Sequence, residues 1–144
     1  MAGYSGKTIT EKIGAKPGQR VYVDGLPEAL ELVWPAGVRV LRRLPASAVD
    51  IAWCFCANRD RLERRIDLLV TRIVVNGALW VSWPKKASGM ATDLDESVVR
   101  ARGLEAGVVD VKVAAVDDTW SALKFVRRLS DRTDGRRNGG NPPS

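Results

Sequence analysis

The chain has 144 residues, 45% of them hydrophobic and 28% charged, which is typical of one ordinary globular domain with a proper core. Its 23 lysines and arginines exceed its 17 acidic residues by six, which favours acidic partners but falls short of the dense cationic face of a nucleic-acid binder. Because there is no histidine and only two cysteines, His-based triads, His metal ligands and Cys–His nucleophile pairs are excluded.

The first elements in the chain are a short helix and a strand. Residues 8–13 predict a helix that ends at Gly14, and residues 20–23 predict the first strand. Pro27 is typical of the first position of a helix, so the sequence predicts a second short helix from there to about Trp34.

Two further strands follow, over residues 38–41 and 49–55. Arg42 comes directly after the first of them. Cys54 and Cys56 lie two residues apart around the end of the second, so both side chains point to one face. One interpretation is that they are small buried hydrophobic residues. The alternative is a redox pair, because a disulfide over this spacing closes a strained ring and is labile.

A longer helix is predicted from Arg61 to about Val75, with Asn58 or Asp60 as its N-cap. Asn76-Gly77 is predicted to end it. The apolar stripe of this helix has 3.6-residue spacing and consists of Leu62, Ile66, Leu69, Val70 and Ile73.

The stretch from Ala78 to Thr92 carries the main functional prediction. Residues 78–83 predict a buried strand that Pro84 stops, and Thr92 is predicted to cap the next helix. A helix N-terminus beside cationic and hydroxyl side chains can hold an anion. The loop residues expected to contribute are Lys85, Lys86, Ser88, Gly89 and Thr92. The alternative is a solvated turn in which Thr92 only caps its helix.

The last elements are a helix over residues 93–102 with Gly103 as its C-cap, and two strands over 109–116 and 122–129. Residues 117–120 predict a hairpin turn between these strands. The segment 131–144 has no apolar periodicity, so we expect it to be disordered.

Strands that alternate with helices predict a single α/β domain over residues 1–130. We expect a Rossmann-like, three-layer arrangement with a mostly parallel sheet of about six strands that ends in an antiparallel hairpin. No apolar run approaches the ~20 residues of a membrane span, and the N-terminus lacks the apolar region of a signal peptide. We therefore expect a cytoplasmic protein that does not contact membranes.

Ligands of open α/β sheets bind outside the carboxyl ends of the strands, and the residues with useful chemistry fall at these ends. The ligand-binding candidates are Asp24, Arg42, Lys85, Lys86, Ser88, Gly89, Thr92, Asp117 and Trp120. Asp117 is alternatively a turn-forming residue, and Trp120 alternatively covers the edge of the sheet.

Several short motifs resemble known families. The lead-in Lys16-Pro17-Gly18-x-Arg20-Val21 resembles that of S-adenosylmethionine-dependent methyltransferases. More closely, the chain is similar to a family of small Rossmann-like bacterial proteins, common in actinobacteria and known as a domain of unknown function. The segments that carry this similarity are Met1–Gly6, Trp83–Gly89, Thr92–Leu94, Val116-Asp117 and Thr119–Ser121. It implies the fold and no particular activity.

The chain departs from the methyltransferase pattern in two places. The resemblance implies a glycine-rich loop after the first strand and an acid after the second, which would contact the cofactor. Here Asp24-Gly25-Leu26-Pro27 supplies one glycine, and Arg42 and Arg43 stand where the acid is expected.

The primary hypothesis is therefore a non-enzymatic, regulatory binding module without a cofactor, metal or catalytic residue. It would engage an anionic small molecule or an acidic protein surface through residues 85–92; nucleic acid is not the expected partner. The alternatives are a methyltransferase-like enzyme with an atypical cofactor site and a thiol-based redox sensor that uses Cys54 and Cys56.

Overall fold

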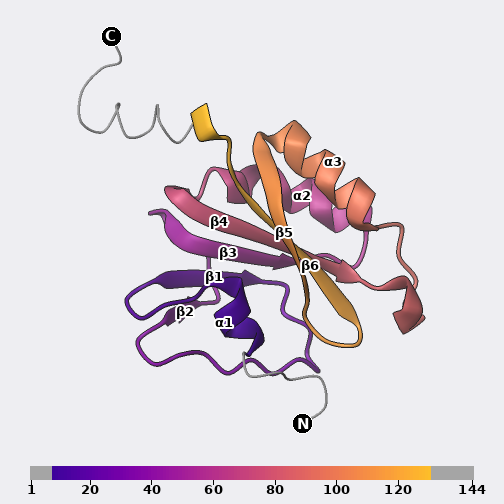
Figure 1. The fold of residues 1–144 in the computed structure, drawn as a ribbon, viewed down its shortest axis with the longest axis horizontal. Coiled ribbons are helices and arrows are strands. Elements are labelled where there is room, and N and C mark those ends of the chain that lie inside the picture. The colour runs from indigo at the N-terminus through magenta and orange to yellow at the C-terminus, as the bar shows by residue number, and fades with distance from the viewer. Residues whose placement is uncertain (1–7, 131–144) are drawn as a thin grey trace.

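A six-stranded sheet runs through the computed structural model, which describes residues 8–130 (Figure 1). The strands are β1 Arg20–Asp24, β2 Arg39–Leu41, β3 Val49–Phe55, β4 Ile73–Pro84, β5 Val108–Ala115 and β6 Trp120–Arg127. The helices are α1 Ile9–Ile13, α2 Arg59–Val70 and α3 Glu96–Ala106, with a 3-10 turn, η1, at Lys86–Ser88. The motif at Met1–Gly6 and the segment 131–144, which we expect to be disordered, lie outside the described residues.

The strands lie in the order β2-β1-β3-β4-β6-β5. The first four are parallel to one another, whereas β6 is antiparallel to both β4 and β5. This arrangement confirms the predicted, mostly parallel sheet with a terminal antiparallel pair. It also brings the carboxyl ends of β1, β2, β3, β4 and β5 to one edge, which we call the carboxyl edge. In the described residues, no helix is long and apolar enough to cross a bilayer.

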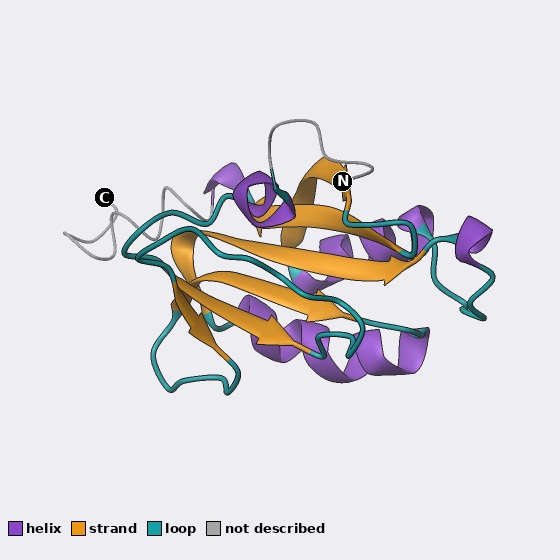
Figure 2. Cartoon of the chain, turned by 90° about the horizontal axis from the view of Figure 1, so that it is seen from below, coloured by secondary structure: helices purple, strands orange, loops and turns teal. Residues whose placement is uncertain are grey.

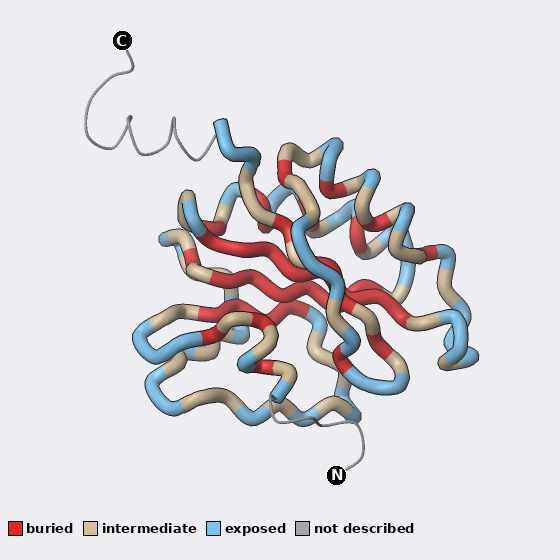
Figure 3. The backbone as a smooth tube through the Cα atoms, viewed as in Figure 1, coloured by how far each residue is buried: buried red, intermediate tan, exposed pale blue. Residues whose placement is uncertain are grey.

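The sheet separates two hydrophobic cores. Helices α2 and α3 pack on one face, and α1 with the loop from β1 to β2 packs on the other, so helices lie on both sides of the sheet (Figure 2). Strands β3 and β4 are buried on both faces, which explains why they read as nearly continuous apolar runs (Figure 3). Trp80 and Trp83 lie in different cores, as their odd spacing predicts.

The helix predicted from Pro27 to Trp34 is absent. The chain there is irregular, with a turn in which the Leu30 amide donates to the Pro27 carbonyl over 3.1 Å. Leu30, Leu32 and Trp34 are spaced by two and pack partly buried against the α1-side core. Tertiary packing of an extended segment therefore overrides the local helix signal of Pro27.

The predicted end of α2 was wrong as well. The helix begins after Asn58, whose side chain accepts from the Arg61 amide over 3.0 Å, but it ends at Val70. Ile73 already belongs to β4, because a run of β-branched residues favours strand over helix. Gly77 lies inside this strand; a Cβ there would lie 2.6 Å from the Asp50 carbonyl oxygen, so glycine permits a close approach of β3.

Helix α3 is shifted by about one turn from its predicted position. Its N-cap is Asp95, whose carboxylate accepts from the Val98 amide over 2.9 Å, so the predicted cap Thr92 was wrong. Gly103, predicted as the C-cap, lies inside the helix, and Gly107 ends it with φ 102°. Two capping glycines in one segment are ambiguous from sequence alone, because either can take the left-handed position.

Candidate functional site

The sheet places every ligand-binding candidate at or just beyond the carboxyl edge. Asp24 is the last residue of β1, Arg42 follows β2, and the loop 85–92 follows β4. Asp117 lies in the β5–β6 turn, and Trp120 is the first residue of β6. The structure gives these residues different roles, however. Some are engaged by the protein's own groups, and others have no internal partner within the described residues.

Asp24 is the centre of a buried polar network. Its carboxylate forms an ion pair with Arg61 Nη2 over 2.9 Å and accepts a hydrogen bond from Arg65 Nε over 2.7 Å. The Tyr22 hydroxyl donates to it over 3.3 Å, and Cys54 Sγ lies 3.4 Å from its Oδ2. The network ties two turns of α2 to β1 and β3. Asp24 is therefore a structural anchor in this arrangement, with its oxygens already engaged, rather than a group turned towards a ligand.

The neighbours of Asp24 are held in their neutral forms. Burial, and then the nearby Asp24 charge, raise the pKa of Tyr22. A hydrogen bond with Cys56, followed by burial, raises the pKa of Cys54 well above its usual value. Both groups therefore remain protonated near neutral pH and can donate to the carboxylate. One negative charge faces the two guanidinium groups of Arg61 and Arg65.

Cys54 and Cys56 are free thiols on the α2 side of the sheet, 1% and 0% exposed, with their sulfur atoms 3.4 Å apart. The structure confirms that both point to one face and are buried. The two sulfur atoms are nevertheless within hydrogen-bonding distance of each other, which goes beyond simple packing. In residues 8–130, no group of cysteine or carboxylate side chains is arranged as a metal site would be.

The loop after β4 is a compact turn. The Lys85 amide donates to the Thr119 carbonyl over 2.7 Å, which pins the start of the loop to the β5–β6 turn. Ser88 Oγ donates to the Lys85 carbonyl over 2.6 Å and accepts from the Met90 amide over 3.1 Å. Gly89 closes the turn with φ 79°, a left-handed conformation that favours glycine. Ser88 and Gly89 therefore shape the loop.

The helix N-termini beside this loop already have acceptors. Asp93 Oδ1 accepts from the Arg59 amide at the start of α2 over 2.8 Å, and Asp95 serves α3 in the same way. Thr92 Oγ1 accepts only from the Leu94 amide, over 3.1 Å. The helix-terminus part of the predicted anion cradle is thus filled by the protein itself. In the described part of the chain, the Lys85 and Lys86 ammonium groups have no hydrogen-bond or ion-pair partner.

The remaining candidates divide in the same way. Asp117 Oδ1 accepts from the Thr119 and Trp120 amides over 2.9 and 2.7 Å, so it builds the turn. Trp120 is 7% exposed and meets Phe55 edge to face, with ring centroids 5.4 Å apart, so it covers the sheet. Arg42 is exposed beyond β2 and has no side-chain partner within residues 8–130.

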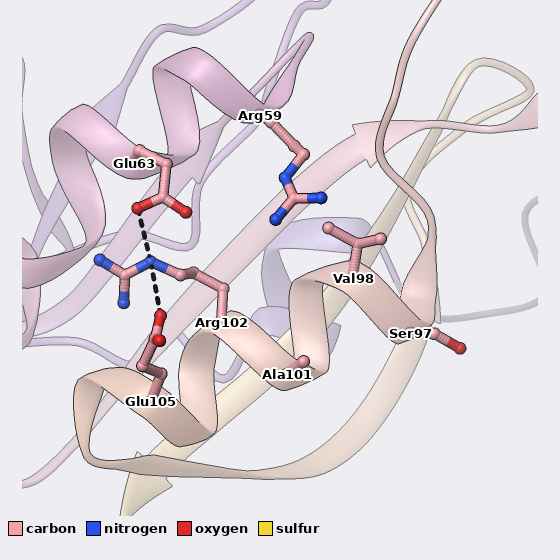
Figure 4. Close-up of a pocket in the computed structure, with 7 residues that line it drawn as sticks. All are labelled: Arg59, Glu63, Ser97, Val98, Ala101, Arg102 and Glu105. Carbon is pink, nitrogen blue, oxygen red and sulfur yellow. Dashed lines mark hydrogen bonds and ion pairs between the residues drawn. The ribbon is translucent and has the colours of Figure 1, made fainter.

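Sequence reasoning missed a groove of about 370 Å³ between α2 and α3 (Figure 4). Arg102 crosses it and pairs with Glu63 over 2.8 Å, and with Glu105 over 3.4 Å. Arg59 reaches in from the start of α2, beside Val98. The i,i+4 spacing of Arg59 and Glu63 favours a pair within α2, but Glu63 pairs across the groove instead. This groove is the interface at which α2 and α3 pack together, and the charge of Arg102 at its centre is already neutralised by the two glutamates.

The position after β1 does not fit S-adenosylmethionine. Gly25 adopts φ 73°, and a Cβ there would lie 2.6 Å from Arg61 Nη2 and 3.0 Å from the Phe55 carbonyl oxygen. The Arg61 guanidinium thus fills the space over the single glycine of this loop, and Arg61 Nε donates to that carbonyl over 3.0 Å. The positive charge of a sulfonium cofactor would be repelled there by the Arg61 guanidinium. In addition, Arg42 and Arg43 stand where the methyltransferase resemblance implies a ribose-binding acid.

The comparisons with known proteins identify the fold. No protein-family model and no curated protein sequence matches the chain. A proposed methyltransferase from Thermoplasma acidophilum matches with a TM-score of 0.50 at 8% identity, over 80% of this chain and 70% of that one. Fibrillarin in its complex with Nop5p matches at 0.46 and 11% identity, over 76% and 73% of the two chains. A proposed type 11 methyltransferase from Sulfolobus solfataricus gives 0.42 and 19%, over 65% and 60%.

At these identities the likeness concerns the fold alone. The chain is a single Rossmann-like α/β domain with a methyltransferase-like sheet.

Proposed function

We propose that the chain is a non-enzymatic, regulatory binding module that engages an anionic ligand or an acidic protein surface through the loop of residues 85–92. The observation that supports this most is the pair Lys85 and Lys86, two adjacent cations at the carboxyl edge that have no internal partner among residues 8–130. The same proposal includes a cytoplasmic location. It also assigns the chain to the actinobacterial domain of unknown function that the motif of residues 83–89 resembles.

The argument rests on how the nearby carboxylates are used. Asp24 serves two arginines, Asp93 accepts from the Arg59 amide, and Asp117 accepts from two amides of its own turn. Each one is therefore committed to fold-building contacts. None of these three carboxylates contacts Lys85 or Lys86, so both ammonium groups remain available to an external anion. Since lysine acts as a mobile point charge, the pair suits either a phosphate or a cluster of carboxylates.

We predict that the double variant Lys85→Ala/Lys86→Ala weakens binding of pyrophosphate and of poly-L-glutamate at least tenfold. Isothermal titration calorimetry measures both, with pyrophosphate as the small anion and the polymer as a stand-in for an acidic protein surface. The free energy of unfolding should change by less than about 0.5 kcal/mol, because neither ammonium group has a partner in the part of the chain that the structure describes.

A matched control is Lys12→Ala/Arg39→Ala, which removes the same two charges from α1 and from the start of β2. It should leave both affinities within twofold of wild type, because the loop is intact. Attraction that depended only on net charge would instead weaken equally in the two double variants. Equal weakening by the two double variants would refute a site at residues 85–92. So would a wild-type protein that binds neither probe.

A thiol-based redox sensor is the second candidate, because the sulfur atoms of Cys54 and Cys56 already lie in contact. Hydrogen peroxide would take two electrons from the pair: one thiolate is oxidised to a sulfenic acid, and the other thiol displaces water to form the S–S bond. The overall change consumes one peroxide and releases two waters. Loss of the Cys54 proton would also remove a donor from Asp24.

The burial of both thiols predicts, against the sensor, that they do not react in the native protein. A thiol reagent such as an aromatic disulfide should leave both cysteines unmodified until the chain unfolds, because neither is more than 1% exposed and the Cys54 pKa is raised. Mass spectrometry counts the labels. A loss of two hydrogen masses in the native protein under mild peroxide, absent in Cys56→Ser, would instead establish the sensor.

The methyltransferase-like enzyme is the remaining alternative, and only the fold supports it. Arg61 over Gly25 opposes a cofactor in the expected place. We therefore assign no transfer chemistry to the chain.

A further inference from the structure

We propose that Lys16, Lys112 and Lys124 form a second anion site, which takes a phosphoryl group on the α1 side of the sheet. We call these three residues the lysine cluster. The site is separate from the loop 85–92, and its argument does not depend on the function proposed above.

The sheet register brings two of the lysines together. Lys112 of β5 and Lys124 of β6 are direct partners in the antiparallel ladder. Side chains directly opposite each other share one face, with Cβ atoms about 5 Å apart. On its other side, Lys124 is paired in register with Trp80 of β4, whose Nε1 donates to the Ile13 carbonyl at the end of α1. Lys124 therefore lies at the border between the α1-covered sheet and the open hairpin.

Lys16 joins them from the loop that follows α1. Burial is the first cause that lowers the pKa of Lys124, and the charges of Lys112 and Lys16 lower it further. Lys112 and Lys16 are both exposed, and they lie near enough for their charges to act on the half-buried Lys124. In residues 8–130, none of the three ammonium groups has a hydrogen-bond or ion-pair partner.

This arrangement destabilises the protein on its own. Like charges directly opposite each other in a sheet repel. A partly buried lysine without a partner also loses hydration, and no hydrogen bond or ion pair compensates for that loss. The other cation of these two strands, Arg127, has internal partners, because its Nη2 donates to the Val70 and Ile73 carbonyls. The one carboxylate of β5, Asp110, pairs with Arg100 of α3 over 2.9 Å. Local conflicts that a fold tolerates occur preferentially at functional sites, where an absent ligand resolves them.

The cluster suits a phosphoryl group better than a single carboxylate. Three ammonium groups that approach from three segments present point charges to a compact oxyanion with several acceptor oxygens, whereas planar carboxylates pair best with the arginine fork. A phosphate dianion would neutralise most of the repulsion among the three residues. The phosphoryl group could belong to free phosphate or to a nucleotide.

The test is a titration of the ¹⁵N-labelled full chain with inorganic phosphate at constant ionic strength, followed by amide shifts in NMR spectra. We expect saturable shifts at residues 16, 112 and 124, and a dissociation constant at least fivefold higher in Lys124→Gln and in Lys112→Gln. Lys12→Gln, a neighbouring α1 lysine, is the control and should bind as wild type does. Adenosine monophosphate in a second titration identifies the source: additional shifts and tighter binding indicate a nucleotide, and identical behaviour indicates phosphate alone.

Three results would overturn the site. The first is the absence of saturable shifts at the three residues, and the second is unchanged affinity in Lys124→Gln. The third is a melting temperature of phosphate-free Lys124→Gln below that of wild type, because a lysine that is repelled by its neighbours should lower stability and not raise it. The variant Lys85→Ala/Lys86→Ala should keep the cluster's response, so failure of the loop proposal and failure of this one are distinguishable.

Discussion

Gly103→Ala is expected to lower the free energy of unfolding by about 3 kcal/mol, the upper part of the range for an overpacked core. Alanine is the better helix former by about 1 kcal/mol, so helix propensity alone predicts the opposite sign. A Cβ at Gly103 would lie 2.1 Å from Phe125 Cε1 and 2.5 Å from its Cζ, and the Phe125 ring is fully buried in β6. The ring cannot retreat, because the sheet lies behind it. Urea denaturation with linear extrapolation measures the change.

The explanation by steric overlap has its own check. Phe125→Leu in the Gly103→Ala background should recover part of the loss, so that the two substitutions couple strongly in a double-mutant cycle. Ser97→Ala, at an exposed position of the same helix, should change stability by less than about 0.5 kcal/mol. If Gly103→Ala were neutral or stabilising, α3 would not approach β6 as closely as the structure places it.

The parts of the fold that could be predicted are those set by local signals. The apolar run of β3 matches its predicted bounds, and Asn58 caps α2 because its side chain can accept an orphan amide. The errors lie where tertiary contacts decide. Gly77 and Gly103 both read as helix ends, yet each is a position where two backbones or a ring come too close for a Cβ. Glycine alone does not tell these cases apart.

The location of the candidate site could be predicted from the sequence, but the contacts among its residues could not. The topology puts Asp24, Arg42 and the lysines of the loop at one edge, as the alternation of strands and helices indicates. The pairing of Asp24 with Arg65 joins residues 41 apart in the chain, and no local pattern signals it. In hindsight, the i,i+4 spacing of Arg61 and Arg65 was the available clue, because it presents two guanidinium groups on the helix face nearest β1.

The conformation of the carboxyl edge depends on this network. Arg61 and Arg65 hold α2 to β1, and the Arg59 amide at the start of the same helix holds Asp93 of the loop that carries Lys85 and Lys86. A loosened helix would therefore move the loop as well. The proposed anion site and the buried carboxylate are linked through one turn of α2.

Asp24→Asn is accordingly expected to destabilise the protein by about 2–3 kcal/mol, because it leaves two guanidinium groups without their counter-charge while it keeps the shape of the side chain. Breaking a fully buried pair costs about 3–5 kcal/mol. The expected value is lower here because the Arg61 side chain is 37% exposed and water screens part of the interaction. Asp60→Asn is the matched control: its partner Arg64 and Asp60 itself are 74% and 71% exposed, so the change should stay below about 0.5 kcal/mol. Urea denaturation of both variants at neutral pH measures the difference, and equal effects of the two substitutions would contradict a stabilising role for the Asp24 network.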